Sequence, residues 1–207
     1  DAFRKLSRGN ILEEIGVVHE PFGISTALFG RMTTASPLQN VDAAVYRAHR
    51  IGVHRLDDDT DFYTAVDDLS GKTAYLDRSG QGVAFGATLY YGYEAIDMRQ
   101  LTKNLQGDTG LAHRALIAFL RASLMAIPSG MRTRFGQSSR PSFVVLEVLP
   151  NGEQPNNAVE AFLTPVRGSM DTPLGHAARN ALIAYLQQSA RMYDMFVARA
   201  YIAPEKL

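Results

Sequence analysis

A polar stretch from His54 to Gly82 interrupts an otherwise apolar and periodic sequence, and it limits the folds that are open to the chain. It contains two short β-prone runs, Phe62 to Val66 and Thr73 to Leu76, which are separated by a turn-rich segment. Two such runs joined by a turn predict a β-hairpin. Because its tips are too polar to be buried in a core, we expect the hairpin to protrude from the body of the protein.

The apolar spacing in the rest of the sequence predicts strands and helices. Ile24 to Phe29 is short, apolar and bounded by glycines, as expected of a buried strand. Asn40 to His54 has the spacing of a helix with Asn40 as its N-cap, although its valines leave a helix-to-strand transition open. The other expected elements are a strand over 83–93, helices over 97–105, 110–127, 157–166 and 173–191, a loop over 131–142, and strands over 143–149 and 195–202. Together they predict an α+β fold of the ferredoxin-like kind, with the hairpin as an excursion from it.

Length and residue usage exclude several classes of protein. The 207 residues suit one large domain, and the absence of cysteine excludes disulfides, thiolate nucleophiles and cysteine-ligated metal centres. No run of about 18 apolar residues is present, which disfavours a membrane span, and we expect a cytoplasmic protein. Neither a nucleophile elbow nor a phosphate-binding loop of the nucleotide-hydrolysing kind is recognisable.

The charges cancel in total but are unevenly distributed. Lysine and arginine number 21, as do aspartate and glutamate, which argues against a protein that coats nucleic acid indiscriminately. The interval from Thr109 to Leu146 has no acidic residue and contains Arg114, Arg121, Arg132, Arg134 and Arg140. An acidic block precedes it at Asp57, Asp58, Asp59, Asp61, Asp67 and Asp68. This asymmetry fits self-association or a locally positive ligand groove, and it fits equally two solvated faces without function.

The acidic cluster from Asp57 to Asp61 is a candidate divalent-cation site, because magnesium and calcium prefer oxygen ligands. A metal-dependent nuclease that uses this cluster is therefore an alternative function. The spacing matches no calcium-binding loop, however, and a solvated or partner-facing acidic turn also explains it. A histidine metal site is disfavoured because His49 and His54 have arginine neighbours. We expect no catalytic residue, no metal and no cofactor.

Arginine, methionine and aromatic residues occur together in three short segments, Gly30 to Met32, Phe62 with Tyr63, and Met131 to Phe135. Guanidinium groups bind phosphates, and flat or soft apolar side chains stack on bases or wedge between them. This combination is typical of proteins that bind single-stranded nucleic acid. In the alternative interpretation, Met32 and Phe62 are core residues and the arginines lie on the surface without function.

Three blocks of sequence carry a more specific signal: Ala27 to Met32, Asn40 to His49, and Asp61 to Leu69. In these blocks, and in the spacing between them, the chain closely resembles the CasC backbone family of the type I-E CRISPR Cascade complex. The third block, Asp-x-x-Thr-Ala-Val-Asp-Asp-Leu, is the most specific of the three. The likeness runs from about Ile24 to the C-terminus.

The resemblance implies an RNA-binding protein that is not an enzyme. Family members have a modified RNA-recognition (ferredoxin-like) palm with a protruding thumb β-hairpin, and several copies polymerise along one CRISPR RNA. Each thumb displaces a guide base at regular intervals, so that the remaining bases can pair with target DNA. The implied partners are the CRISPR RNA, the target DNA strand through the guide, neighbouring copies of the chain, and the other Cascade subunits.

Carried onto this sequence, the resemblance assigns residues 54–82 to the thumb and the rest of 1–207 to a single palm domain. Family members begin with a palm strand and a basic helix that grips the RNA. Residues 1–22 match neither of these, so the palm is expected to be N-terminally incomplete relative to the family.

The resemblance also implies roles for individual residues. Met32 corresponds to the family's wedge methionine, Arg31 is implied to contact a phosphate, and Tyr63 is implied to be the thumb aromatic beside the displaced base. The basic loop after Pro128 matches a family segment near the RNA path. The expected RNA-binding residues are Arg31, Met32, Phe62, Tyr63, Arg132 and Arg134.

Overall fold

Segments far apart in the sequence combine into two units, each with an apolar core of its own. The first unit comprises residues 1–48, 94–146 and 199–207, and the second comprises residues 49–93 and 147–198. The protein is described from a computed structural model. The residues that the structure describes are 23–34, 40–56, 58–61, 64–66, 73–75, 83–126, 128–130, 132–136, 138–195 and 197–203.

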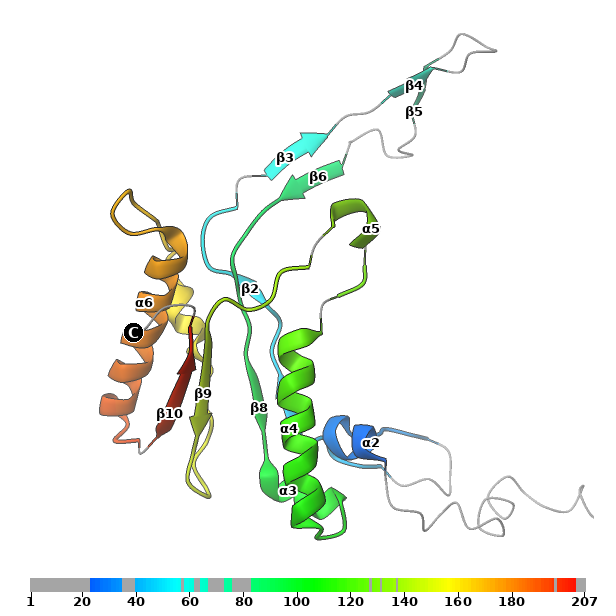
Figure 1. The fold of residues 1–207 in the computed structure, drawn as a ribbon, viewed down its shortest axis with the longest axis vertical. Helices are drawn as coiled ribbons and strands as arrows, with labels where there is room; N and C mark the ends of the chain where they lie inside the picture. Colours follow the sequence, from blue (N-terminus) through cyan, green and yellow to red (C-terminus); the bar gives the residue numbers. More distant parts are fainter. Residues whose placement is uncertain are drawn as a thin grey trace, which may run out of the picture. The chain divides into compact units, whose positions relative to one another are not determined.

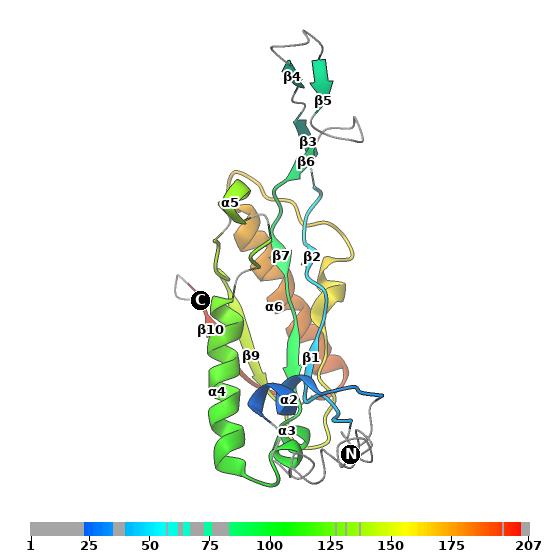
Figure 2. The same cartoon turned by 90° about the vertical axis from the view of Figure 1, so that its right-hand side faces the viewer.

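The first unit combines helices with antiparallel strands (Figure 2). Its elements are α2 (Ile24–Phe29), β1 (Val45–Arg47), β8 (Glu94–Ile96), α3 (Met98–Asn104), α4 (Thr109–Met125) and the single turn α5 (Arg132–Phe135). Strands β1 and β8 pair with Val45 opposite Ile96. Helices α3 and α4 begin at the aspartate N-caps Asp97 and Asp108, whose carboxylates accept backbone N–H bonds of the first turn.

The core of the first unit is made of small and aliphatic side chains. Helix α4 contributes Ala112, Ala115 and Phe119, which share one face at helical spacing. The buried residues that pack with them are Ala27, Leu28, Ala44, Val45, Leu101 and Leu105. Because so many of these side chains are alanine, the backbones of α2, α4 and the segment before β1 can approach closely.

Asn104, the last residue of α3, is a buried polar residue whose side chain connects three segments. Its Nδ2 donates to the carbonyl oxygens of Ala27, at 2.9 Å, and Asp42, at 2.8 Å. Its Oδ1 accepts from Gln100 Nε2 at 2.9 Å. Since the amide is hydrogen-bonded through both of its ends, its burial is compensated. These bonds hold α2 and the segment before β1 against α3.

The second unit contains a two-stranded antiparallel ribbon (Figure 1). Strand β2 (Ile51–Gly52) pairs with β7 (Tyr90–Tyr91), β3 (Asp58–Asp61) pairs with β6 (Val83–Gly86), and β4 (Thr64–Val66) pairs with β5 (Thr73–Tyr75). The pairing of β4 with β5 joins the two β-prone runs, as predicted. The β3–β6 pair continues the same two arms of the chain toward β2 and β7.

The remainder of the second unit packs helical segments around a small core. These segments are the 3-10 helix η2 (Ala158–Phe162) and α6 (Leu174–Met192). Val53, Phe162 and Ala178 are buried together.

Tyr91 of β7 joins the ribbon to η2. Its ring lies against Phe162, with 5.2 Å between ring centroids, and its hydroxyl donates to Asn157 Oδ1 and accepts from the N–H of Ala158, both at 3.1 Å. Burial raises the pKa of Tyr91 to about 12, so the hydroxyl remains protonated near neutral pH.

A further pair of strands, β9 (Val144–Val148) and β10 (Ala198–Ile202), lies where the chain passes from one unit to the other. Phe143, next to β9, stacks on Tyr201 of β10 with 6.0 Å between ring centroids. Both strands confirm the predictions for 143–149 and 195–202. The predicted loop over 131–142 contains the helical turn α5, a small difference from the prediction.

The prediction of a buried strand over Ile24 to Phe29 is wrong, because this segment is helix α2. Six residues are too few for an isolated helix to be stable in water. Hydrogen bonds to other segments at its C-terminal end stabilise this short helix. The carbonyl of Ala27 accepts from Asn104, and the carbonyl of Leu28 accepts from the N–H of Ala44 at 3.0 Å. Their donors are distant in sequence, so the local pattern could not reveal them.

The prediction of a helix from Asn40 to His54 is also wrong, since the segment contains β1 and β2. The strand alternative that its valines left open is the one that the structure adopts. Asn40 is not a helix cap, and its Oδ1 instead accepts the backbone N–H of Thr33 at 2.7 Å. Pairing with β8 and β7, more than thirty residues away, decides the conformation.

The α+β class is confirmed, since helices and small antiparallel sheets occur together. The predicted helices over 97–105, 110–127 and 173–191 are present as α3, α4 and α6, whereas 157–166 holds the short η2. The predicted strand over 83–93 is divided into β6 and β7. None of the described helices has the length and apolar character needed to cross a membrane.

Replacement of Asn104 tests whether its amide holds the first unit together. Asn104→Ala should lower the free energy of unfolding by about 3 kcal/mol, because two carbonyl groups lose their donor in a buried site. Urea denaturation measures this loss. Lys103→Ala, at an exposed position of the same helix, should change the stability by less than about 0.5 kcal/mol. Equal effects of the two substitutions would contradict the assignment.

Candidate nucleic-acid interface

Arg31 and Met32 lie on a turn that leaves the end of α2. The N–H of Gly30 donates to the carbonyl of Thr26 at 2.9 Å and closes the helix. Arg31 then forms a two-residue antiparallel bridge with Val41, in which each backbone N–H donates to the other's carbonyl, at 2.9 and 2.8 Å. The backbone of this turn is therefore fixed on both sides of Arg31.

Gly30 is required at this turn for two reasons. Its φ of 76° and ψ of 177° lie in a region that only glycine adopts readily. A β carbon at this position would also lie 2.7 Å from the carbonyl oxygen of Val41 and 2.9 Å from the backbone nitrogen of Ala43. Both atoms belong to the backbone, which cannot move aside without breaking the bridge.

The turn borders a hollow of about 390 Å³, lined by Phe29, Gly30, Arg31, Met32, Asn40, Val41, Asp42 and Ala43. Met32 is 92% exposed at its edge. The interpretation of Met32 as a core residue is therefore wrong. Its apolar side chain is thus accessible at the surface beside Arg31.

The structure brings Arg31 and Met32 together and leaves Arg132 outside that hollow. Arg132 opens the turn α5 and is exposed, and its guanidinium donates to Ser138 Oγ at 3.4 Å. Phe62 and Tyr63 lie outside the described residues, as does the side chain of Arg134. The other six lining residues, among them Phe29 and Asn40, were not assigned to RNA binding from the sequence.

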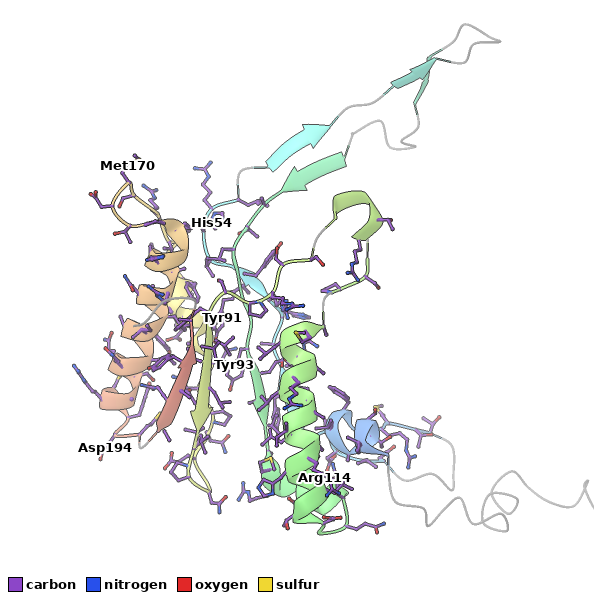
Figure 3. The ribbon with its side chains drawn as sticks, viewed as in Figure 1. His54, Tyr91, Tyr93, Arg114, Met170 and Asp194 are labelled. Atoms are coloured by element: carbon purple, nitrogen blue, oxygen red, sulfur yellow. The ribbon has the colours of Figure 1, made fainter. Side chains whose placement is uncertain are left out.

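The basic interval from Thr109 to Leu146 presents charge on the outer face of α4. Arg114, labelled in Figure 3, and Arg121 are both exposed, two turns apart, on the face opposite the buried alanines. Within the part of the chain that the structure describes, neither forms an ion pair. Arg47, by contrast, is paired with Glu94 at 3.2 Å, and Glu94 also accepts from Ser123.

The described acidic residues do not form a cation-binding site. No group of three or more metal-ligating side chains comes together among them. Asp57, Asp67 and Asp68 lie outside the described residues, and for β3 the structure describes the backbone path.

Comparison with known proteins identifies the family. The profile of the CT1975-like protein family (Cas_CT1975) matches residues 5–206. The chain belongs to this family. Its resemblance to a Cascade backbone protein, indicated by the sequence blocks around Met32 and Asp61, is thereby confirmed, and the solved structures agree. No functionally curated protein sequence matches the chain.

Two solved structures are similar to this CT1975-like protein. One is a chain of a CRISPR RNA-guided surveillance complex, pre-nicking, with 28% sequence identity and a TM-score of 0.80 over 97% of the present chain and 53% of the other. The second is a chain of a CRISPR RNA-guided surveillance complex, with 30% identity and a TM-score of 0.69 over 95% and 71% of the respective chains. The present chain therefore spans about half the length of the first of these relatives.

The turn that presents Met32 can be tested through its glycine. Gly30→Ala should lower the free energy of unfolding by about 2 kcal/mol or more, since it combines an unfavourable backbone conformation with a backbone contact. Gly23→Ala is the matched control at the other end of α2, where a β carbon would meet no atom within 4 Å. Thermal denaturation of both variants compares them. A loss at Gly23 as large as that at Gly30 would refute the argument.

Proposed function

We propose that the chain is a CRISPR RNA-binding backbone subunit of a type I-E Cascade surveillance complex. Membership of the CT1975-like family and the likeness to two chains of CRISPR RNA-guided surveillance complexes support this. The observation that carries the proposal is the exposure of Met32 beside Arg31 on a backbone fixed by Gly30. A surface methionine beside an arginine combines the two contacts that single-stranded RNA offers, a base face and a phosphate.

In the proposed mechanism, the protein holds the RNA backbone and base pairing reads the sequence. Arg31, Arg132 and Arg134 bind phosphates, and Met32 enters between neighbouring bases. The hairpin that contains β3 to β6 acts as the thumb, with Phe62 and Tyr63 beside the displaced base. The bases left stacked on either side remain available to the target DNA strand.

The proposal includes an assembly of copies along one guide. Each copy has a modified RNA-recognition palm, and its thumb reaches the RNA held by the next copy. The acidic block on the hairpin sequence and the basic interval from Thr109 to Leu146 have opposite charge, which favours contact between copies. Other Cascade subunits complete the complex in the cytoplasm, and the chain itself catalyses no reaction.

Fluorescence anisotropy of a labelled single-stranded RNA is the direct test. The chain is titrated at several salt concentrations with manganese present, and the RNA is then examined on a gel. Cooperative, salt-sensitive binding to RNA that remains intact is the expected result. Cleavage that Asp59→Ala abolishes would replace the proposal with the nuclease alternative. Binding that is absent at every salt concentration would contradict RNA binding by this chain.

The phosphate contacts predict a change in salt dependence. Arg132→Ala should weaken binding and lower the slope of log affinity against log salt by about one unit, because one phosphate contact is lost. Arg134→Ala should act in the same way. Arg99→Ala is the control, since Arg99 is also exposed but lies 3.8 Å from Asp97 as an ion pair. An unchanged slope in both loop variants would remove the loop from the interface.

The wedge role of Met32 predicts a change in base displacement with little change in affinity. An RNA carrying 2-aminopurine becomes more fluorescent when that base leaves the stack. Met32→Ala should reduce this increase several-fold, because the alanine side chain is too short to enter between neighbouring bases and hold them apart. Met170→Ala, at a methionine that is 99% exposed in the second unit, should have no effect. A normal increase with Met32→Ala would exclude the wedge.

A further inference from the structure

The imidazole of His54 takes the place of a backbone acceptor where the ribbon of the second unit is interrupted. Beyond the β2–β7 pair, the N–H of Val53 donates to the carbonyl of Leu89 at 2.9 Å, as in a regular antiparallel ladder. The reciprocal bond, from the N–H of Leu89 to the carbonyl of Val53, is replaced. The carbonyl of Val53 accepts from Val166 at 2.9 Å, and the N–H of Leu89 donates to His54 Nε2 at 3.1 Å.

These partners define the protonation of the ring. A nitrogen that accepts a backbone N–H carries no proton, so Nε2 is the unprotonated nitrogen. Nδ1 lies 2.7 Å from the carbonyl oxygen of Arg55, which can only accept, so Nδ1 carries the proton. The hydroxyl of Thr88 lies 3.2 Å from Nε2 and donates to the carbonyl oxygen of Leu89 at 3.4 Å. His54 is therefore a neutral ring in its Nδ1–H tautomer, with each nitrogen in a different role.

The two arms of the ribbon are unequal at this point. Five residues separate Gly52 from Asp58 on the first arm, and three separate Gly86 from Tyr90 on the second, as the two registers require. An unequal step of this kind interrupts the ladder and leaves backbone groups without their usual partners. His54, labelled in Figure 3, lies within this step.

The far end of the step is closed by a side-chain contact. Leu56 covers Gly86, where a β carbon would lie 2.7 Å from Leu56 Cδ1. The step between the β2–β7 and β3–β6 pairs is thus closed by the Leu56 contact at one end and by the His54 ring at the other. We call these residues, His54, Leu56, Gly86, Thr88 and Leu89, the joint.

We propose that His54 is a positioning residue of the thumb. Its ring, as the acceptor for Leu89, holds the joint in one arrangement, and the joint in turn holds the hairpin steady while the hairpin displaces a base. This inference rests on the RNA-binding function proposed above. The proposal assigns this role to Nε2 as a hydrogen-bond acceptor. A side chain that fills the same space without an acceptor at this position is not expected to replace it.

Two substitutions divide the functions of the ring. In His54→Gln, the terminal amide oxygen can reach the N–H of Leu89 and replace Nε2. In His54→Asn, the shorter side chain can replace Nδ1 but cannot reach Leu89. His54→Ala removes both contacts. His113→Ala is the control, because His113 also has Nδ1 against a backbone carbonyl, that of Thr109 at 2.8 Å, but is exposed on α4.

Hydrogen exchange at the Leu89 amide and 2-aminopurine fluorescence on bound RNA are measured for each variant of the full chain. Circular dichroism first verifies that each is folded, and the ¹⁵N shifts of the His54 ring in the unsubstituted chain report the tautomer. With His54→Asn and His54→Ala, exchange at Leu89 should be about tenfold faster and base displacement should fall by half or more. His54→Gln and His113→Ala should behave as the unsubstituted chain does.

Any different result contradicts a specific part of the proposal. Normal base displacement by His54→Asn would show that the acceptor is not needed for the thumb, and failure of His54→Gln to restore displacement would show that Nε2 is not the group that matters. A protonated Nε2 in the ring spectrum would overturn the tautomer. If the unsubstituted chain displaces no base, the proposed function fails together with the role in displacement, whereas the exchange data still decide whether His54 is the acceptor.

Discussion

The side-chain amide of Asn104 is the contact on which the first unit depends. Through two donated bonds it fixes the end of α2 and the segment before β1 to the same point of α3. The turn from Gly30 to Met32 lies between these two segments, so its backbone path is determined before any ligand is present. A buried amide with both ends bonded favours one arrangement over others, because every alternative leaves a polar group unpaired. The surface that carries Arg31 and Met32 thus depends on a polar contact inside the core.

The two units differ in the feature that the rest of the unit has to stabilise. The first presents the apolar side chain of Met32 to solvent, on a turn whose backbone is fixed at Gly30 and by the bridge between Arg31 and Val41. The second carries a ribbon of short strand pairs, and isolated two-stranded ribbons are marginally stable in water. There the stability comes from the attachment of β7 to η2 through Tyr91, and from the contacts of the joint. In both units, hydrogen-bonded polar side chains support the parts that are proposed to contact RNA: Asn104 in the first unit, and Tyr91 and His54 in the second.

Sequence patterns predicted the elements whose determinants are local. Helices α3 and α4 follow aspartate caps and a regular apolar face, and β4 and β5 follow two β-prone runs around a turn. The failures were at Ile24 to Phe29 and Asn40 to His54, where donors and strands distant in sequence decide the conformation. In the site, the segment around Met32 was indicated by its residue types and by the resemblance to a family, and the exposure of Met32 was then seen in the structure. The requirement for Gly30 and the acceptor role of His54 depend on backbone atoms brought close by folding, so no sequence pattern could reveal them.

The contact of Leu56 with Gly86 lies between the base of the hairpin, where it is attached to the second unit, and the paired strands that set the length of the hairpin. All contacts of the joint lie on the near side of Gly86, and the regular β3–β6 register begins there. Residues added or removed in matching pairs beyond this point change the length of the ribbon by about 3.4 Å each, without altering a bond at the joint. The length of the hairpin can therefore differ between relatives, or be changed by engineering, while the contacts of the joint stay the same.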